Sequence, residues 1–219
     1  VTLLAEVRAA YDSPATPVVV SGNIGPRGDG YRAGSRMSAA AAHDYHMAQI
    51  ATFSGTEADM VAAFTLTYPE EAIGIVDAAA ACEMPVVISF TLETDGRLPS
   101  GDALSEAILR TDAETGSYAA YYMVNCVHPS HLAPALAGRG AWRERLHGLR
   151  ANASRRRHAE LDEATELDDG DPEALGEHYL ALQKLLPRMN VVGGCCGTDE
   201  RHVASIARHL TGRPARAGP

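Results

Sequence analysis

The sequence lacks the features that mark several protein classes. Its 219 residues include only four cysteines, too few for the disulfide framework of a small secreted protein: Cys82, Cys126, Cys195 and Cys196. No apolar run reaches the roughly 18–20 residues of a membrane span, and the opening residues lack a signal-peptide pattern. Basic residues are outnumbered, 19 Lys and Arg against 28 Asp and Glu, for a net charge of -9. We therefore expect a cytoplasmic protein that binds neither nucleic acid nor membrane.

What remains is an ordinary globular composition. Hydrophobic residues make up 46% of the chain, enough for one sizeable core. No linker, internal repeat or low-complexity tract divides the sequence, so we predict one domain over residues 1–219. The first residue is Val1 rather than Met, which favours a processed or truncated start.

Short apolar runs rich in β-branched residues alternate with longer helical patterns. Six runs are predicted strands: 16–22, 58–67, 84–92, 117–126, 146–154 and 188–194. They are spaced by about the length of a βαβ unit. Because the clearest runs are continuously apolar rather than alternating, they predict an α/β fold with a parallel sheet covered by helices.

Helix signals are clearest near the end of the chain. In "TDERHVASIARHLTG" (198–212), Thr198 is expected to cap a helix that Gly212 ends. Asp171 is expected to open the preceding helix, whose apolar stripe is Leu175, Tyr179, Leu182 and Leu186. The charged stretch between the fifth and sixth strands, 155–171, could form a binding surface, but we expect a solvated loop.

The predicted strands end in polar and turn residues. In a (β/α) barrel the active site is assembled from these carboxyl ends. Cys126 closes the fourth strand in "NCVHP", and Cys195 and Cys196 close the sixth in "GGCCGT". Adjacent residues of a strand point to opposite faces, but a turn that the flanking glycines allow would let both cysteines aim at one point. Three sulfur ligands and one open position make a workable catalytic zinc site.

Other readings of the cysteines and histidines are available. The adjacent cysteines could form a strained disulfide or be buried as small apolar residues. For Cys82, on an apolar helix face, packing is the expected role. His43 and His46 lie three apart on a predicted helix and could share a metal, but packing and surface roles are favoured.

The cysteine motifs together resemble those of the homocysteine S-methyltransferase family. Supporting similarities are "SGNIGP", "YHMAQI" and "SFTLETDGRLPSG", and the resemblance runs from about residue 16 to 210. It implies a (β/α)8 TIM barrel of which this chain holds about six βα units. It also implies Zn²⁺ bound by Cys126, Cys195 and Cys196.

The resemblance further implies a cytoplasmic enzyme of methionine biosynthesis. Such an enzyme transfers a methyl group from a small-molecule donor to the homocysteine thiolate, which occupies the fourth zinc position. Asn152 is then a resting-state ligand or substrate contact, and Asn125 and Gly194 lie around the pocket. The sequence identifies neither the methyl donor nor the oligomeric state, and a homo-oligomer is allowed.

Two departures from the family pattern stand out. The chain has no counterpart of the family's first two strands, so we expect a fragment of a longer chain or a barrel completed by another subunit. Many members place Glu-Thr where this chain has Phe64 and Thr65, which removes a partner for the substrate ammonium. Glu70 or Glu93 could compensate, although surface roles are simpler. The alternatives are a non-catalytic zinc-binding fragment and methyl transfer to another small thiol or a selenol.

Overall fold

Six parallel strands form one curled sheet in the order of the sequence. The structure is a computed structural model, and it describes residues 1–212. The strands are β1 (Ser21–Ile24), β2 (Met60–Leu66), β3 (Val86–Phe90), β4 (Tyr121–Val127), β5 (Leu146–Ala151) and β6 (Val191–Gly194). Each pairs only with its sequence neighbours, so all their carboxyl ends lie at one edge.

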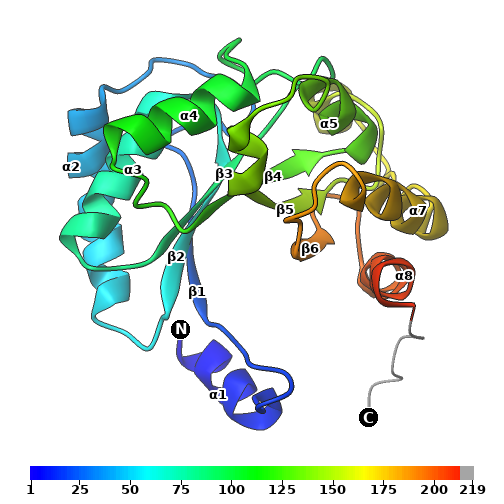
Figure 1. Cartoon of the computed structure of the whole chain (residues 1–219), viewed down its shortest axis with the longest axis horizontal. Helices are drawn as coiled ribbons and strands as arrows, with labels where there is room; N and C mark the ends of the chain where they lie inside the picture. Colours follow the sequence, from blue (N-terminus) through cyan, green and yellow to red (C-terminus); the bar gives the residue numbers. More distant parts are fainter. Residues whose placement is uncertain (213–219) are drawn as a thin grey trace.

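Most helices of residues 1–212 follow a strand and cover the outer side of the sheet (Figure 1). They are α1 (Thr2–Tyr11), α2 (Ala39–Ser54), α3 (Pro69–Ala81), α4 (Leu104–Glu114), α5 (Pro129–Ala135), α6 (His158–Asp162), α7 (Pro172–Gln183) and α8 (Glu200–Thr211), with a 3-10 helix, η1 (Ala141–Arg145). None of the helices within 1–212 is long and apolar enough to cross a membrane. Helix α1 has no buried residue and is attached to the sheet by two hydrogen bonds from Arg8 to Asp59.

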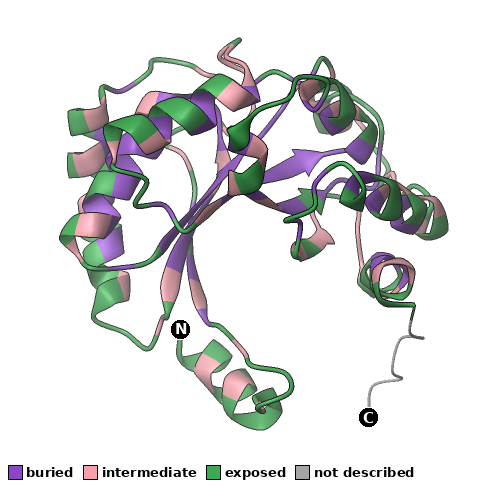
Figure 2. Ribbon diagram, viewed as in Figure 1, coloured by how far each residue is buried: buried purple, intermediate pink, exposed green. Residues whose placement is uncertain are grey.

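The core lies between the sheet and its helices (Figure 2). Alternate strand residues such as Ile88 and Leu149 point toward the helices and are fully buried there, and so is Tyr179 of α7. A second, smaller cluster of Ala62, Val87 and Met123 lies on the opposite side, which we call the inner face. The inner face corresponds to the inside of a barrel, so the fold is an incomplete (β/α) barrel, as predicted.

The predicted elements differ from the observed ones mainly at their ends. All six strands exist, but β1 begins at Ser21 rather than at residue 16, and Val19 is 61% exposed. Helix α8 is capped by Asp199, which accepts a bond from Arg201 N, so the Thr198 cap was wrong. The Asp171 cap, the apolar stripe and the left-handed Gly212 are confirmed. Among the described strands, β1 and β6 each have one unpaired edge.

Candidate metal centre

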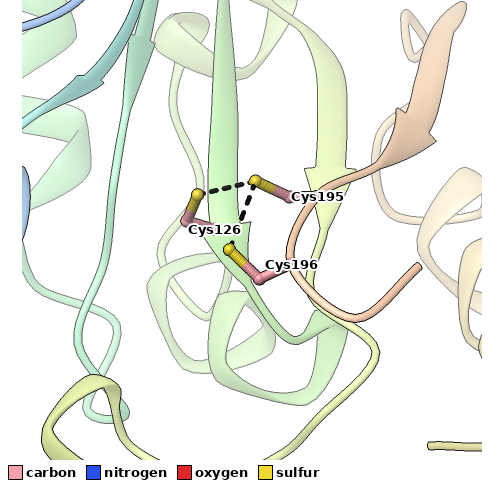
Figure 3. Close-up of side chains that lie close together, drawn as sticks. All are labelled: Cys126, Cys195 and Cys196. Carbon is pink, nitrogen blue, oxygen red and sulfur yellow. Dashed lines mark hydrogen bonds between the residues drawn. The ribbon is translucent and has the colours of Figure 1, made fainter. Parts of the chain in front are cut away.

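Three cysteine side chains meet at the carboxyl edge of the sheet (Figure 3). Cys126 is the penultimate residue of β4, and Cys195 and Cys196 directly follow β6. The Sγ atoms of Cys126 and Cys195 are 2.7 Å apart, and those of Cys195 and Cys196 are 4.0 Å apart. All three sulfurs lie within 4.8 Å of one another, and all three cysteines are free. The convergence predicted from the sequence is therefore present.

A tight turn after β6 lets two adjacent cysteines face the same point. Cys195 N continues the sheet by donating to Ala151 O at 2.7 Å, and the chain then turns at Gly197, whose φ is +76°. Thr198 closes the turn through its Oγ1, which donates to Cys195 O at 2.7 Å. Gly194 leaves the space that Thr198 occupies, since a Cβ at Gly194 would overlap the Thr198 side chain. Thr198 thus shapes the turn rather than capping the helix.

Cys126 is held in an unusual backbone conformation. Its φ of +53° lies in the left-handed region, and the pairing of β4 with β5 shifts register between Asn125 and Val127. Such conformations cost free energy and persist where neighbouring contacts enforce them. Asn125 supplies those contacts: its Nδ2 donates to Cys126 Sγ at 3.2 Å and to Thr65 Oγ1 at 2.9 Å. Its Oδ1 accepts from Thr65 N at 2.9 Å and from Ser89 Oγ at 2.7 Å.

Asn152 fixes the second half of the cluster. Its side chain is buried, and its Oδ1 accepts a hydrogen bond from Cys196 N at 3.1 Å. Its backbone N–H donates to Val127 O, which ties the end of β5 to the end of β4. Asn152 therefore joins the two strand ends that carry the cysteines. Its predicted role as a ligand or substrate contact stays a prediction.

A cavity of about 210 Å³ opens beside Cys196. Its wall includes Asn152 and Gly197, and also Tyr31, His158 and Asp168, which the sequence did not single out. Tyr31 reaches over from the β1–α2 loop, with its hydroxyl 3.9 Å from Cys196 Sγ and its ring 4.1 Å from the His158 ring. His158 Nε2 donates to Cys126 O at 2.6 Å. The charged stretch 155–171, expected as a solvated loop, is mostly exposed and also forms one wall of this cavity.

The three thiols share charge through their hydrogen bonds. Bonds donated by Cys126 and then by Cys195 lower the pKa of Cys196 to about 2. Hydrogen bonding with Cys126 and then Cys196 raises the pKa of Cys195 far above its usual range. Burial, followed by the charge of Cys126, raises the pKa of Tyr31, which keeps its hydroxyl a neutral donor. One thiolate is thus stable by itself, and full ionisation of the cluster requires a nearby cation.

The cluster has the donor set and nearly the spacing of a zinc site. Tetrahedral zinc with Zn–S bonds of about 2.3 Å separates two sulfur ligands by about 3.8 Å. The 4.0 Å between Cys195 and Cys196 agrees with this value. The 2.7 Å between Cys126 and Cys195 needs about 1 Å of adjustment, which side-chain rotation can supply. The residues present therefore fit a metal ion with three sulfur ligands.

The rival candidates have other roles. His46 is buried and bonds Glu71 at 3.0 Å, and His43 pairs with its neighbour Asp44, so neither joins a metal cluster among residues 1–212. Cys82 is half-buried, with its Sγ 3.6 Å from Met47 Sδ, in agreement with a packing role.

The two carboxylates that could replace the family's Glu at Phe64 differ in position, and only Glu93 lies near the cysteine cluster, where it lines a small cavity with Cys126 and Asn152. Glu70 pairs with Arg110 at 2.6 Å, outside the inner face. Glu93 lies 3.6 Å from His158 Nδ1, near the cavity wall.

Comparison with known proteins gives one family and one fold. The family model described as homocysteine S-methyltransferase matches residues 1–210. The metallated form of the homocysteine methyltransferase MmuM from Escherichia coli superposes with a TM-score of 0.70 at 19% identity, over 94% of this chain and 67% of that one. Its apo form gives 0.71 at 20% identity, over 95% and 71%. The chain thus spans about two thirds of MmuM, and the likeness supports the barrel fold.

Proposed function

The chain belongs to the homocysteine S-methyltransferase family, and from that premise we propose that it transfers a methyl group to the thiol of homocysteine, giving methionine. Cys126, Cys195 and Cys196 hold Zn²⁺ for this reaction. The observation that carries the proposal is the convergence of these three sulfurs from two strand ends beside a cavity. Pockets at the carboxyl ends of barrel strands are where such enzymes place their chemistry.

The chemistry requires a thiolate acceptor. A free thiol has a pKa of about 8.5 and is mostly protonated at neutral pH, while the thiolate is the nucleophile. Zn²⁺ supplies the positive charge that lets a substrate thiol lose its proton at neutral pH. The homocysteine sulfur then uses a lone pair to form the new S–CH3 bond, and the donor departs with the electron pair of its old bond to the methyl carbon.

The chain's own residues position this centre and shape its pocket. Asn125 holds Cys126 in its left-handed conformation, and Asn152 holds the Cys196 backbone. Tyr31 and His158 pack against each other beside Cys196 and form part of the cavity wall there. Asn152 also lines the cavity next to Cys196, where a substrate contact is expected. Holding the acceptor sulfur in line with the methyl group lowers the entropic cost of the reaction.

Metal analysis of two cysteine variants tests the metal assignment. We expect about one zinc per chain in the purified protein and loss of that zinc in Cys196→Ala with the fold intact. Cys82→Ala is the matched control, because Cys82 packs away from the cluster, and it should keep the metal. Zinc retained in Cys196→Ala would defeat the assignment.

Methionine formation tests the activity. Zinc-loaded protein is mixed with homocysteine and, in turn, betaine, S-methylmethionine and a methyl folate. Formation with one of the donors supports the proposal and identifies that donor. Zinc binding without methyl transfer to any thiol favours the alternative, a non-catalytic zinc-binding barrel fragment. The observation behind this alternative is that β1 and β6 each leave an edge unpaired among the described strands.

The thiol that accepts the methyl group could also be a compound other than homocysteine. Phe64 lies on the inner face, where its side chain packs against the Ala62, Val87 and Met123 cluster. A phenyl ring carries no negative charge and so cannot form the ion pair that a Glu would form with the ammonium of an amino acid. Another small thiol or a selenol is therefore the second candidate acceptor, and methylation of that compound in preference to homocysteine would favour it.

A further inference from the structure

Arg150 extends over the inner face of the sheet beside the cysteine cluster. Its neighbours in β5, Leu149 and Ala151, are buried against the helices, so the alternation of a strand directs Arg150 to the other side. Its Nε lies 3.4 Å from Gly194 O, the carbonyl directly before Cys195. Its Cζ lies 5.1 Å from the centre of the Phe64 ring in β2. The guanidinium thus spans the inner face from β5 toward β2.

The charge of Arg150 has no acidic partner in the described part of the chain. None of the ion pairs of residues 1–212 includes Arg150. The inner-face side chains around it are neutral, namely Asn125, its register partner in β4, Phe64, whose ring its guanidinium covers, and Ser89, which bonds Asn125. Gly193, its register partner in β6, has no side chain to cover it. An accessible guanidinium therefore stands next to the proposed acceptor site.

We propose that Arg150 binds the acid group of the thiol substrate, so that the inner-face side of the cysteine cluster selects thiols by their carboxylate rather than by their ammonium group. This inference rests on the proposed function. A guanidinium can hold a carboxylate through two parallel hydrogen bonds, and stacking on Phe64 pre-orients its plane. Phe64 itself offers no charge to an ammonium group. A site of this kind would accept homocysteine by its acid end and would also accept mercapto acids that have no amino group.

Equilibrium binding of three related thiols tests the proposal without any methyl transfer. They are homocysteine, the same molecule without its amino group (γ-mercaptobutyrate) and the same molecule without its carboxyl group (γ-mercaptopropylamine). Isothermal titration calorimetry on the zinc-loaded chain gives each Kd. We expect the two acids to bind with similar affinities and the amine to bind at least about tenfold more weakly. A tenfold difference is the contribution of one charge-assisted hydrogen-bonded contact.

Variants of the arginine then assign the effect to its side chain. Arg150→Gln should weaken both acids about tenfold and leave the amine unchanged, and Arg150→Lys should restore part of the loss. Arg188→Gln is the matched control. Arg188 lies on the loop before β6 and pairs with Glu144, so this variant should change no Kd. Equal affinities of the three thiols, or an equal loss of affinity for all three in Arg150→Gln, would overturn the inference about Arg150 and leave the proposed function standing. A zinc-loaded protein that binds no thiol overturns the proposed function with it.

Discussion

Replacing Asn125 by Ala separates the role of this residue in the metal centre from its role in the fold. The side chain is 2% exposed and makes four hydrogen bonds, to Thr65 N, Thr65 Oγ1, Ser89 Oγ and Cys126 Sγ. At a net value of about 1 kcal/mol per bond, partly recovered by relaxation, the metal-free protein should lose about 3 kcal/mol of unfolding free energy.

The zinc-bound protein should lose more. Residues that orient metal ligands typically change metal affinity about 10- to 100-fold when removed. Because zinc stabilises the folded state in proportion to the logarithm of its affinity, a tenfold loss adds about 1.4 kcal/mol of destabilisation at the same free zinc concentration. The Asn125→Ala penalty should therefore be about 4–6 kcal/mol with zinc and about 3 kcal/mol without it.

Denaturant unfolding of the natural chain and the variant, with buffered zinc and with chelator, measures both penalties. Asn190→Ala is the control, since Asn190 is exposed before β6 and should change neither value by more than about 0.5 kcal/mol. Equal penalties with and without zinc would refute the reasoning, because Asn125 would then support the fold and not the metal centre.

Three further changes have defined outcomes. Gly194→Ala should lower zinc affinity at least about tenfold in a chelator competition, because its Cβ overlaps Thr198 in the turn that aims both cysteines, whereas Gly138→Ala, at an open position, should keep it. Glu71→Ala should lower the unfolding free energy by about 3 kcal/mol in a denaturant titration, because it removes the hydrogen-bond partner of the buried His46. A loss below about 1 kcal/mol would contradict this prediction. Burial and then Arg155 lower the pKa of His178, which accepts a hydrogen bond from Arg155 and so is neutral in the fold. The unfolded chain therefore binds more protons below about pH 6.5, and stability should fall as the pH drops from about 7 to 5. His178→Gln should reduce the loss of unfolding free energy between about pH 7 and pH 5. An unchanged loss would show that His178 is not its cause.

The parts of the molecule that the sequence predicted are those set by local pattern. The apolar runs located all six strands, and "GGCCGT" with "NCVHP" located the three sulfurs, because strand ends share one edge of a parallel sheet. Gly212 and Asp171 marked helix boundaries correctly, since their conformations depend on neighbours along the chain. The Thr198 error has a tertiary cause. Its hydroxyl bonds Cys195 O in the turn, which leaves Asp199 to cap α8.

The residues that the sequence missed are brought to the site by loops. Tyr31 lies 165 positions from Cys196 and reaches it only through the path of the β1–α2 loop. That loop is held partly by Arg27 N, which donates to the buried Glu71 at 2.7 Å, a contact with no sequence pattern. His158 begins a short helix inside a charged stretch whose composition favours a solvated loop over a binding surface. Arg150 has no ion-pair partner among residues 1–212, because the inner-face positions of the six described strands carry no carboxylate, and only the register of the strands reveals this.

Zinc K-edge X-ray absorption on the purified, metal-loaded chain tests the central claim most directly. The account predicts three sulfur neighbours at about 2.3 Å around each zinc, with one lighter atom completing the shell. Addition of homocysteine should raise the sulfur count to four at the same distance. A shell dominated by nitrogen or oxygen, or a sulfur count unchanged between the natural chain and Cys126→Ala, would contradict the assignment of Cys126, Cys195 and Cys196 to one metal ion.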